Sequence, residues 1–224
     1  MDENSKSSPR GESTRDALLD AATLVFAREG FASANLRQIA QAAGANPALI
    51  GYHFHSKDGL YLAVFQRIVA GIGKTLGPIL DRIDRELAVP AGAEPRAEDR
   101  RSCLDLLLAF VEGLLVHLVH EHPAWGELIA REMGAPSTAF DLLYQGAIGR
   151  GQGALVGLLR RIRPGADLEQ TRLLAAAIAA QVLLLRHARA PFMRLLGWEA
   201  IGPRELDVMK AQIRRNITLL ALGD

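Results

Sequence analysis

Residues 35–60, NLRQIAQAAGANPALIGYHFHSKDGL, contain two short helical patterns joined by a tight turn and followed at once by a third. Asn35 is a favourable N-cap for the first helix, and Gln38 lies three positions later, where its side chain reaches back to the Asn35 amide. Gly44 supplies the left-handed residue that ends this helix. The apolar positions recur at helical spacing and predict one buried face: Leu36, Ile39, Ala40 and Ala43.

A second helix is predicted over Pro47–Phe54, capped by Asn46, with its proline at the first position, where a missing amide hydrogen costs nothing. Ile50 and Phe54 point to the core. Small residues face outward and let the backbone approach a phosphate or a base edge: Ala48 and Gly51. Two helices joined in this way and braced by a third form a helix-turn-helix, which lays its second helix in the DNA major groove.

The third helix starts at the Ser56 cap, and its first turn carries Lys57 and Asp58. The dipole of the helix start and the Lys57 ammonium together predict an anion site. Between residues 71 and 78, glycines and a proline weaken or kink this helix before residues 79–87 resume it. Upstream, residues 14–28 show a helical period, and Gly30 ends this helix. The helix is expected to cover the helix-turn-helix.

These residues resemble the N-terminal DNA-binding domain of TetR-type transcriptional regulators. That segment ends in an aromatic-His-Phe-x-Ser-Lys-x-x-Leu phrase, which here reads YHFHSKDGL from Tyr52 to Leu60. The resemblance covers Arg15–Phe65. The motif and the resemblance together implicate these residues in DNA binding: Asn35, Arg37, Asn46, Pro47, Ala48, Leu49, Tyr52, His53 and Lys57. The alternative is packing within the short helix for Tyr52 and His53, and a solvated helix surface for Arg37.

The sequence departs from the family at two places in the second helix. Gly51 stands where an aromatic phosphate contact is common, and Pro47 stands where a polar residue reads a base. Both changes remove hydrogen-bonding groups. Operator specificity is therefore expected to rest on Arg37, Asn46, contacts of Leu49 with thymine methyl groups, and DNA shape.

The rest of the chain shows helical periodicity and no β-type alternation of useful length, so the fold class is predicted to be all-α, with about nine helices. Residues 89–95 form a predicted loop, and residues 191–203 a predicted irregular stretch. The remaining helices are predicted at these ranges: 102–120, 123–133, 138–162, 167–189 and 205–222.

Three regions are predicted: a disordered arm at 1–13, the helix-turn-helix domain at 14–57 and a helical bundle at 58–224. From Leu128, the phrase LIAREMGAPSTAFDLLY and the helices after it resemble the C-terminal domain of the CecR-like branch of the family. This resemblance implies a homodimer through the 167–189 and 205–222 helices. An alanine face would permit close approach there: Ala175, Ala176, Ala179 and Ala180.

A small, largely apolar effector is expected inside this bundle. The candidate lining residues are its few aromatic or adaptable side chains: Phe110, Leu114, His117, Trp125, Met133, Phe140 and Tyr144. Ordinary core filling is the alternative for each of them.

Composition limits the other functional classes. The net charge is only +1, and residues 1–60 hold six Lys or Arg against seven Asp or Glu, so bulk electrostatics alone predicts no acidic partner. The single cysteine, Cys103, excludes an internal disulfide framework and fits a reducing cytosol. No secretory signal is evident, and the longest apolar run, Leu173–Leu185, is shorter than the roughly 20 residues that cross a bilayer. A cytoplasmic protein without a membrane partner is expected.

Histidines and glycines suggest two further sites, and neither pattern is complete. His117, His120 and His122 beside Glu121 lack a closing ligand at a fixed spacing, so no metal is predicted. The following glycines lie inside a helical pattern and follow no strand, so no phosphate cradle or cofactor is predicted: Gly146, Gly149, Gly151, Gly153 and Gly157. No catalytic constellation stands out.

The sequence therefore favours a ligand-responsive, homodimeric transcriptional repressor of a palindromic operator. Three alternatives stay open: an all-helical enzyme, a DNA-binding architectural protein without an effector, and a helical protein-interaction module.

Overall fold

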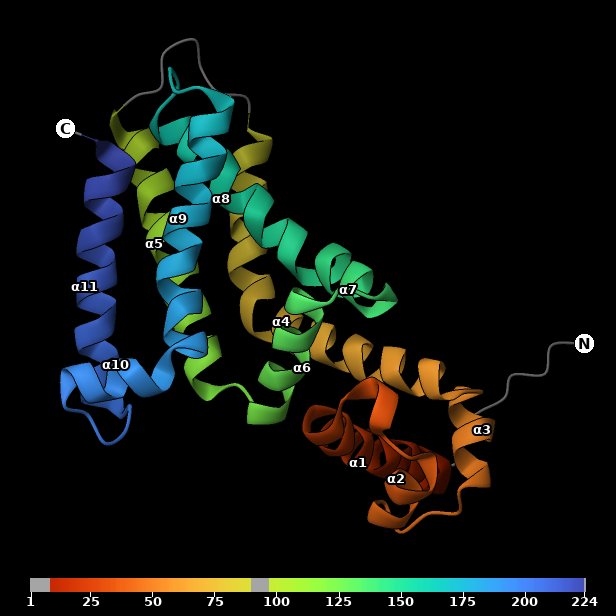
Figure 1. Ribbon diagram of the computed structural model, residues 1–224. Coiled ribbons are helices and arrows are strands. Elements are labelled where there is room, and N and C mark those ends of the chain that lie inside the picture. Colours follow the sequence, from red (N-terminus) through yellow and green to blue (C-terminus); the bar gives the residue numbers. More distant parts are fainter. Residues whose placement is uncertain (1–8, 90–96, 224) are drawn as a thin grey trace, which may run out of the picture. The chain divides into compact units, whose positions relative to one another are not determined.

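The computed structural model describes residues 9–89 and 97–223, in which every regular element is a helix. The prediction of an all-α chain is confirmed. In chain order the helices are α1 (Pro9–Ser33), α2 (Leu36–Ala42), α3 (Ala48–Phe54), α4 (Lys57–Ala88), α5 (Ala97–His120), α6 (Pro123–Gly134), α7 (Thr138–Leu143), the π-helix η1 (Tyr144–Ile148), α8 (Gly149–Ile162), α9 (Leu168–His187), α10 (Arg189–Leu196) and α11 (Pro203–Leu222) (Figure 1).

Some predicted boundaries differ from the structure. Residues 9–13, predicted to be disordered, belong to α1, and residues 90–95 of the predicted loop lie outside the described residues. The single helix predicted over 138–162 is interrupted by the π-helical turn η1. Of the predicted irregular stretch 191–203, residues 191–196 are helical instead, because Pro191 falls in the first turn of α10, where a backbone N–H has no intrahelical acceptor. Residues 197–202 lie outside the helices, as predicted.

The chain forms two compact units, each built from separate stretches. The first contains residues up to Gly71 together with His122–Gly146, and the second contains Ile72–Glu121 together with the chain from Ala147 onward. The chain therefore passes from one unit to the other three times. The predicted boundary at residue 57 differs from the first change of unit, which falls between Gly71 and Ile72. This change lies inside α4, which continues without interruption through Gly71 and Pro78.

In the first unit, α1, α2, α3 and the start of α4 enclose an aromatic and aliphatic core. Its fully buried side chains include Phe26, Ile39, Ile50 and Phe65. Gly30 ends the regular part of α1 because its backbone takes φ 79°, a conformation that favours glycine. The Glu132 carboxylate of α6 is also buried in this unit.

In the second unit, α5, α9 and α11 run side by side (Figure 1), and α8 packs on α5. Helix α5 has the length and hydropathy of a membrane span, but its buried leucines belong to the core that it shares with α8, α9 and α11. Gln181, the polar residue inside the apolar run of α9, accepts a hydrogen bond from the Asn216 amide of α11 at 3.0 Å. The buried faces of these apolar helices thus pack within this unit.

Candidate nucleic-acid interface

Helix α2 begins and ends as its sequence predicts, with one exception. The Asn35 side chain accepts a hydrogen bond from the Arg37 N–H at 2.9 Å, and Gly44 has φ 62°. The predicted return of Gln38 to the Asn35 amide is wrong: the Gln38 amide donates to Glu29 Oε1 of α1 at 2.8 Å. The hydrogen bond from Arg28, and to a lesser extent the one from Gln38, lowers the pKa of Glu29. This carboxylate is therefore held by side chains of both α1 and α2.

Helix α3 has one buried face and one open face. Asn46 caps it by accepting a hydrogen bond from the Ala48 N–H at 2.9 Å, and Pro47 already has helical backbone angles. Ile50 and Phe54 are 1% and 4% exposed. These buried residues fix the rotation of α3, because both belong to the core of the first unit.

The open face of α3 carries small residues around one aromatic ring. Ala48 and Gly51 are exposed, Leu49 is half-buried, and Tyr52 is 76% exposed. The Tyr52 ring meets the half-buried His53 ring edge to face at 4.9 Å between centroids. A helix with this surface brings its backbone close to whatever it contacts, with the Tyr52 hydroxyl and the His53 imidazole as hydrogen-bonding groups at its side.

The junction between α3 and α4 depends on two residues that the sequence patterns did not single out. His55 takes φ 67°, which is uncommon for a residue with a side chain. Gly59 packs so closely on the Phe54 carbonyl that an added Cβ would overlap this oxygen. The Gly59 N–H donates to Ser56 Oγ at 3.0 Å, so the predicted cap of α4 is confirmed. A glycine three residues after a capping serine is the signal that marks this tight junction.

Lys57 and Arg37 differ in how free their side chains are. Lys57 Nζ donates to the Ala32 carbonyl at 3.0 Å and lies 5.0 Å from the centre of the Phe31 ring. The ammonium therefore ties the start of α4 to the end of α1, and only its remaining protons are available to an anion. Arg37 is exposed on α2.

The predicted effector residues are divided between the two units. Phe110 and His117 are buried in the second unit, with Leu114 packed against the same core. The others belong to the first unit: Trp125, Met133, Phe140 and Tyr144. Met133 and Tyr144 are exposed there. Trp125 borders a cavity of about 210 Å³, together with Thr23 and Arg67 among other residues.

The three histidines considered as metal ligands have local partners. His117 Nε2 lies 3.8 Å from the Glu121 carboxylate, and the His120 ring contacts the Val116 carbonyl at 2.9 Å. His122 caps α6 by accepting from the Ala124 N–H at 3.2 Å. Within residues 9–89 and 97–223, no group of three metal-ligating side chains gathers.

Two protein families match the chain. The family described as bacterial regulatory proteins, tetR family, matches residues 18–64. The family described as HTH-type transcriptional dual regulator CecR, C-terminal domain, matches residues 104–223.

Relatives extend these matches to nearly the whole chain. The HTH-type transcriptional dual regulator CecR of Shigella flexneri is 28% identical over 217 residues, which are 96% of this chain and 94% of that protein. The transcriptional repressor NicS of Pseudomonas putida is 36% identical over 81 residues, 36% of this chain and 38% of that protein. A TetR-like regulator from Rhodococcus sp. RHA1 shares the fold, with a TM-score of 0.62 at 19% identity over 94% of this chain and 97% of that chain.

Proposed function

Because the chain belongs to the CecR-like branch of the TetR family of transcriptional regulators, we propose that it represses transcription by binding a palindromic operator as a homodimer. A small, largely apolar effector then releases it. The observation that carries the proposal is the open face of α3, where small residues surround Tyr52 while Ile50 and Phe54 hold the helix to the core. In the dimer, two copies of α3 enter successive major grooves about 34–36 Å apart.

The DNA contacts are assigned by the chemistry of each exposed group. Tyr52 and His53 donate to phosphates, and Leu49 contacts thymine methyl groups beside the backbone of Pro47 and Ala48. The Arg37 guanidinium takes a guanine or a phosphate.

The two capping asparagines and Lys57 have a more limited role. Asn35 and Asn46 use their side-chain oxygens as caps, so their amide nitrogens remain as donors to DNA. Lys57 keeps two ammonium protons for a phosphate after bonding to Ala32. These residues therefore strengthen binding to any sequence more than they select one.

The homodimer is assigned to α9 and α11. Apolar residues form an exposed stripe at helical spacing on α9: Leu173, Ala176, Ala177, Ala180 and Leu184. Ala175 of the predicted alanine face is instead buried inside the unit. On α11, Met209, Ile213 and Ile217 face the interior, and the exposed apolar residues are Val208, Ala211, Leu219, Leu220 and Leu222. Two such helices from each protomer bury these leucines in a four-helix contact.

Effector binding and dimerisation are assigned to residues 58–224, and DNA contact to residues 14–57. Phe110, Leu114 and His117 support an apolar site in the second unit, because they line up on α5 with one half-buried and two buried side chains. Its CecR and NicS relatives are bacterial transcriptional regulators, which supports a cytoplasmic location and a role without catalysis.

Footprinting of the purified chain on its own upstream DNA tests the function. A protected palindrome is expected, and protection should fade when a lipophilic effector is found in a compound panel. Leu49→Ala and Tyr52→Phe, both on the open face of α3, should weaken protection, whereas Leu24→Ala, an exposed leucine on α1, should not. Protection by a monomer, or none at any concentration, would contradict the proposal.

A further inference from the structure

Glu132 of α6 is a buried carboxylate whose hydrogen bonds converge from two helices. Its side chain is 4% exposed. One oxygen accepts from the Tyr61 hydroxyl of α4 at 2.9 Å, and the other accepts from the N–H and the Oγ of Ser137 at 2.9 and 2.8 Å. A buried carboxylate is unfavourable unless its acceptors are satisfied, so this geometry ties α4, α6 and the start of α7 at one point.

The neighbouring Arg131 fastens the same end of α6 to α1. Its Nη2 donates to the Ala27 carbonyl at 3.1 Å. Its Nη1 lies 3.4 Å from the place of an added Cβ on Gly30, where the regular part of α1 ends. Two consecutive residues of α6 therefore hold two different helices of the first unit.

Tyr61 connects this point to the start of α4 and thus to α3. The Tyr61 ring lies 5.0 Å from both the Phe26 and Phe31 ring centroids, and Phe31 in turn supports the Lys57 ammonium. Tyr61 stands one helical turn after Lys57, directly past the junction with α3. Burial is the main cause, and the hydrogen bond to Glu132 the second, of a raised pKa of Tyr61. The phenol therefore remains a hydrogen-bond donor throughout the neutral pH range.

Close contacts extend the attachment along α4. An added Cβ on Gly71 would lie 2.5 Å from Cζ3 of Trp125 on α6. An added Cβ on Gly146 of η1 would lie 2.5 Å from Cγ1 of Val69. Residues 122–146 thus pack on residues 61–71 of α4, in the part of this helix that follows α3.

We propose that Glu132 is a positioning residue for DNA binding. By holding α6 and α7 on α1 and α4, it makes residues 122–146 part of the body that carries α3, although they follow it by some seventy positions. The proposal rests on the proposed function in one respect, namely that α3 reads DNA. It assigns to α6 and α7 a role in orienting α3 that the N-terminal motif alone would not supply.

The test uses the full-length chain and a duplex that the wild-type protein selects in vitro from a random library. Glu132→Gln keeps the shape of the side chain but presents an NH2 group to one of the three donors. We expect roughly tenfold weaker binding at a temperature where the variant is folded, corresponding to one hydrogen bond to a charged group. Amide hydrogen exchange should rise in residues 47–65. Glu127→Gln, the same change at an exposed position of α6, is the control and should behave as wild type.

A double-mutant cycle separates positioning from stability. Tyr61→Phe should also weaken binding, and combining it with Glu132→Gln should weaken it no further than the stronger single change, because both remove one contact. Should Glu132→Gln fail to fold, Tyr61→Phe alone decides by the same measurements. Lower thermal stability with wild-type affinity and wild-type exchange in residues 47–65 would overturn the proposal. A wild-type chain that selects no duplex would instead contradict the proposed function, and the exchange measurement would still report on Glu132.

Discussion

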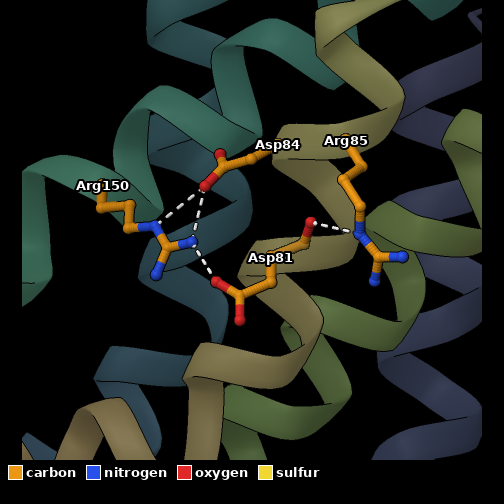
Figure 2. A network of polar contacts seen from close by, with 4 residues as sticks. All are labelled: Asp81, Asp84, Arg85 and Arg150. Atoms are coloured by element: carbon orange, nitrogen blue, oxygen red, sulfur yellow. Dashed lines mark hydrogen bonds and ion pairs between the residues drawn. The ribbon is translucent and has the colours of Figure 1, made fainter.

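The guanidinium of Arg150 donates two hydrogen bonds to one oxygen of Asp84, at 3.1 Å from Nε and 2.5 Å from Nη2. Nη2 also donates to Asp81 Oδ1, one turn earlier on α4, at 2.6 Å, and Arg85 Nε donates to the Asp81 backbone carbonyl at 3.2 Å. Figure 2 shows these four residues together. The hydrogen bonds to Asp81 and Asp84 raise the pKa of Arg150. Further along α8, Arg161 Nη2 donates to the Leu87 carbonyl at 3.0 Å. The second half of α4 is thereby fastened to α8.

Arg150→Ala should lower the free energy of unfolding modestly. The side chains of Arg150, Asp81 and Asp84 are 39%, 65% and 54% exposed, so water screens the ion pairs. The free energy of unfolding is expected to fall by about 0.5–1 kcal/mol. The loss should shrink at about 1 M salt, where the Debye length is short. Chemical denaturation of Arg150→Ala and of the control Arg160→Ala, an exposed arginine on the same helix, checks this. An equal loss in the control would mean that arginine removal as such, and not the network, is responsible.

Gly71→Ala and Gly73→Ala should have opposite effects although they lie two residues apart on α4. A Cβ at Gly71 overlaps the rigid indole of Trp125, and overpacking of this kind destabilises by about 1–3 kcal/mol. A Cβ at Gly73 meets nothing within 4 Å, so the higher helix propensity of alanine should stabilise by about 0.5–1 kcal/mol. Thermal unfolding of both variants measures the difference, and a stabilising Gly71→Ala would mean that Trp125 does not rest on α4 as described.

Lys57→Ala should weaken binding to every DNA sequence and flatten the salt dependence of the affinity by about one unit. The reason is that a phosphate takes the ammonium protons left after the bond to Ala32. Arg37→Ala, which removes an exposed guanidinium, serves as the comparison and should alter sequence preference as well if it contacts a base. Affinity titrations over a range of salt concentrations measure this slope for each variant. An unchanged slope of affinity against salt for Lys57→Ala would mean that Lys57 only ties α4 to α1.

Cys103 should react with thiol reagents only when the second unit opens. Its side chain is 1% exposed, and burial, then the charge of Glu86, raises the pKa of the thiol above its usual 9.0. Because the thiolate is the reactive species, labelling in native buffer near pH 8 should be far slower than in concentrated guanidinium. Rapid labelling of the native chain would show that α5 opens locally.

Stability should depend on Glu205 in a defined acidic window. Its carboxylate accepts from the Gly202 N–H at 3.1 Å and from Arg204 at 3.0 Å. Hydrogen bonds from its own amide and then from Arg204 lower its pKa below the ordinary 4.5. A lowered carboxyl pKa stabilises the fold above the ordinary value and ceases to do so as the pH falls through the lowered one. As the pH falls from about 5 to about 3, the thermal midpoint of Glu205→Gln should therefore fall less than that of wild type. An equal fall in both proteins would exclude this contribution of Glu205.

The sequence alone predicted the features of this protein that depend on neighbours within a few residues. The caps at Asn35, Asn46 and Ser56 and the left-handed Gly44 occur as predicted, because each needs only a nearby amide or its own backbone freedom. The burial of Ile50 and Phe54 follows from helical periodicity for the same reason.

Only the tertiary structure decided the partners of long side chains. Gln38 bonds to Glu29 rather than to its own cap, Lys57 bonds to Ala32, and Glu132 bonds to Tyr61 seventy-one residues away. Periodicity marks which face of a helix is buried, but a flexible polar side chain takes whichever partner the packing of distant helices brings within reach. For that reason the helix-turn-helix motif could be predicted from the sequence, whereas the attachment of α6 and α7 to it could not.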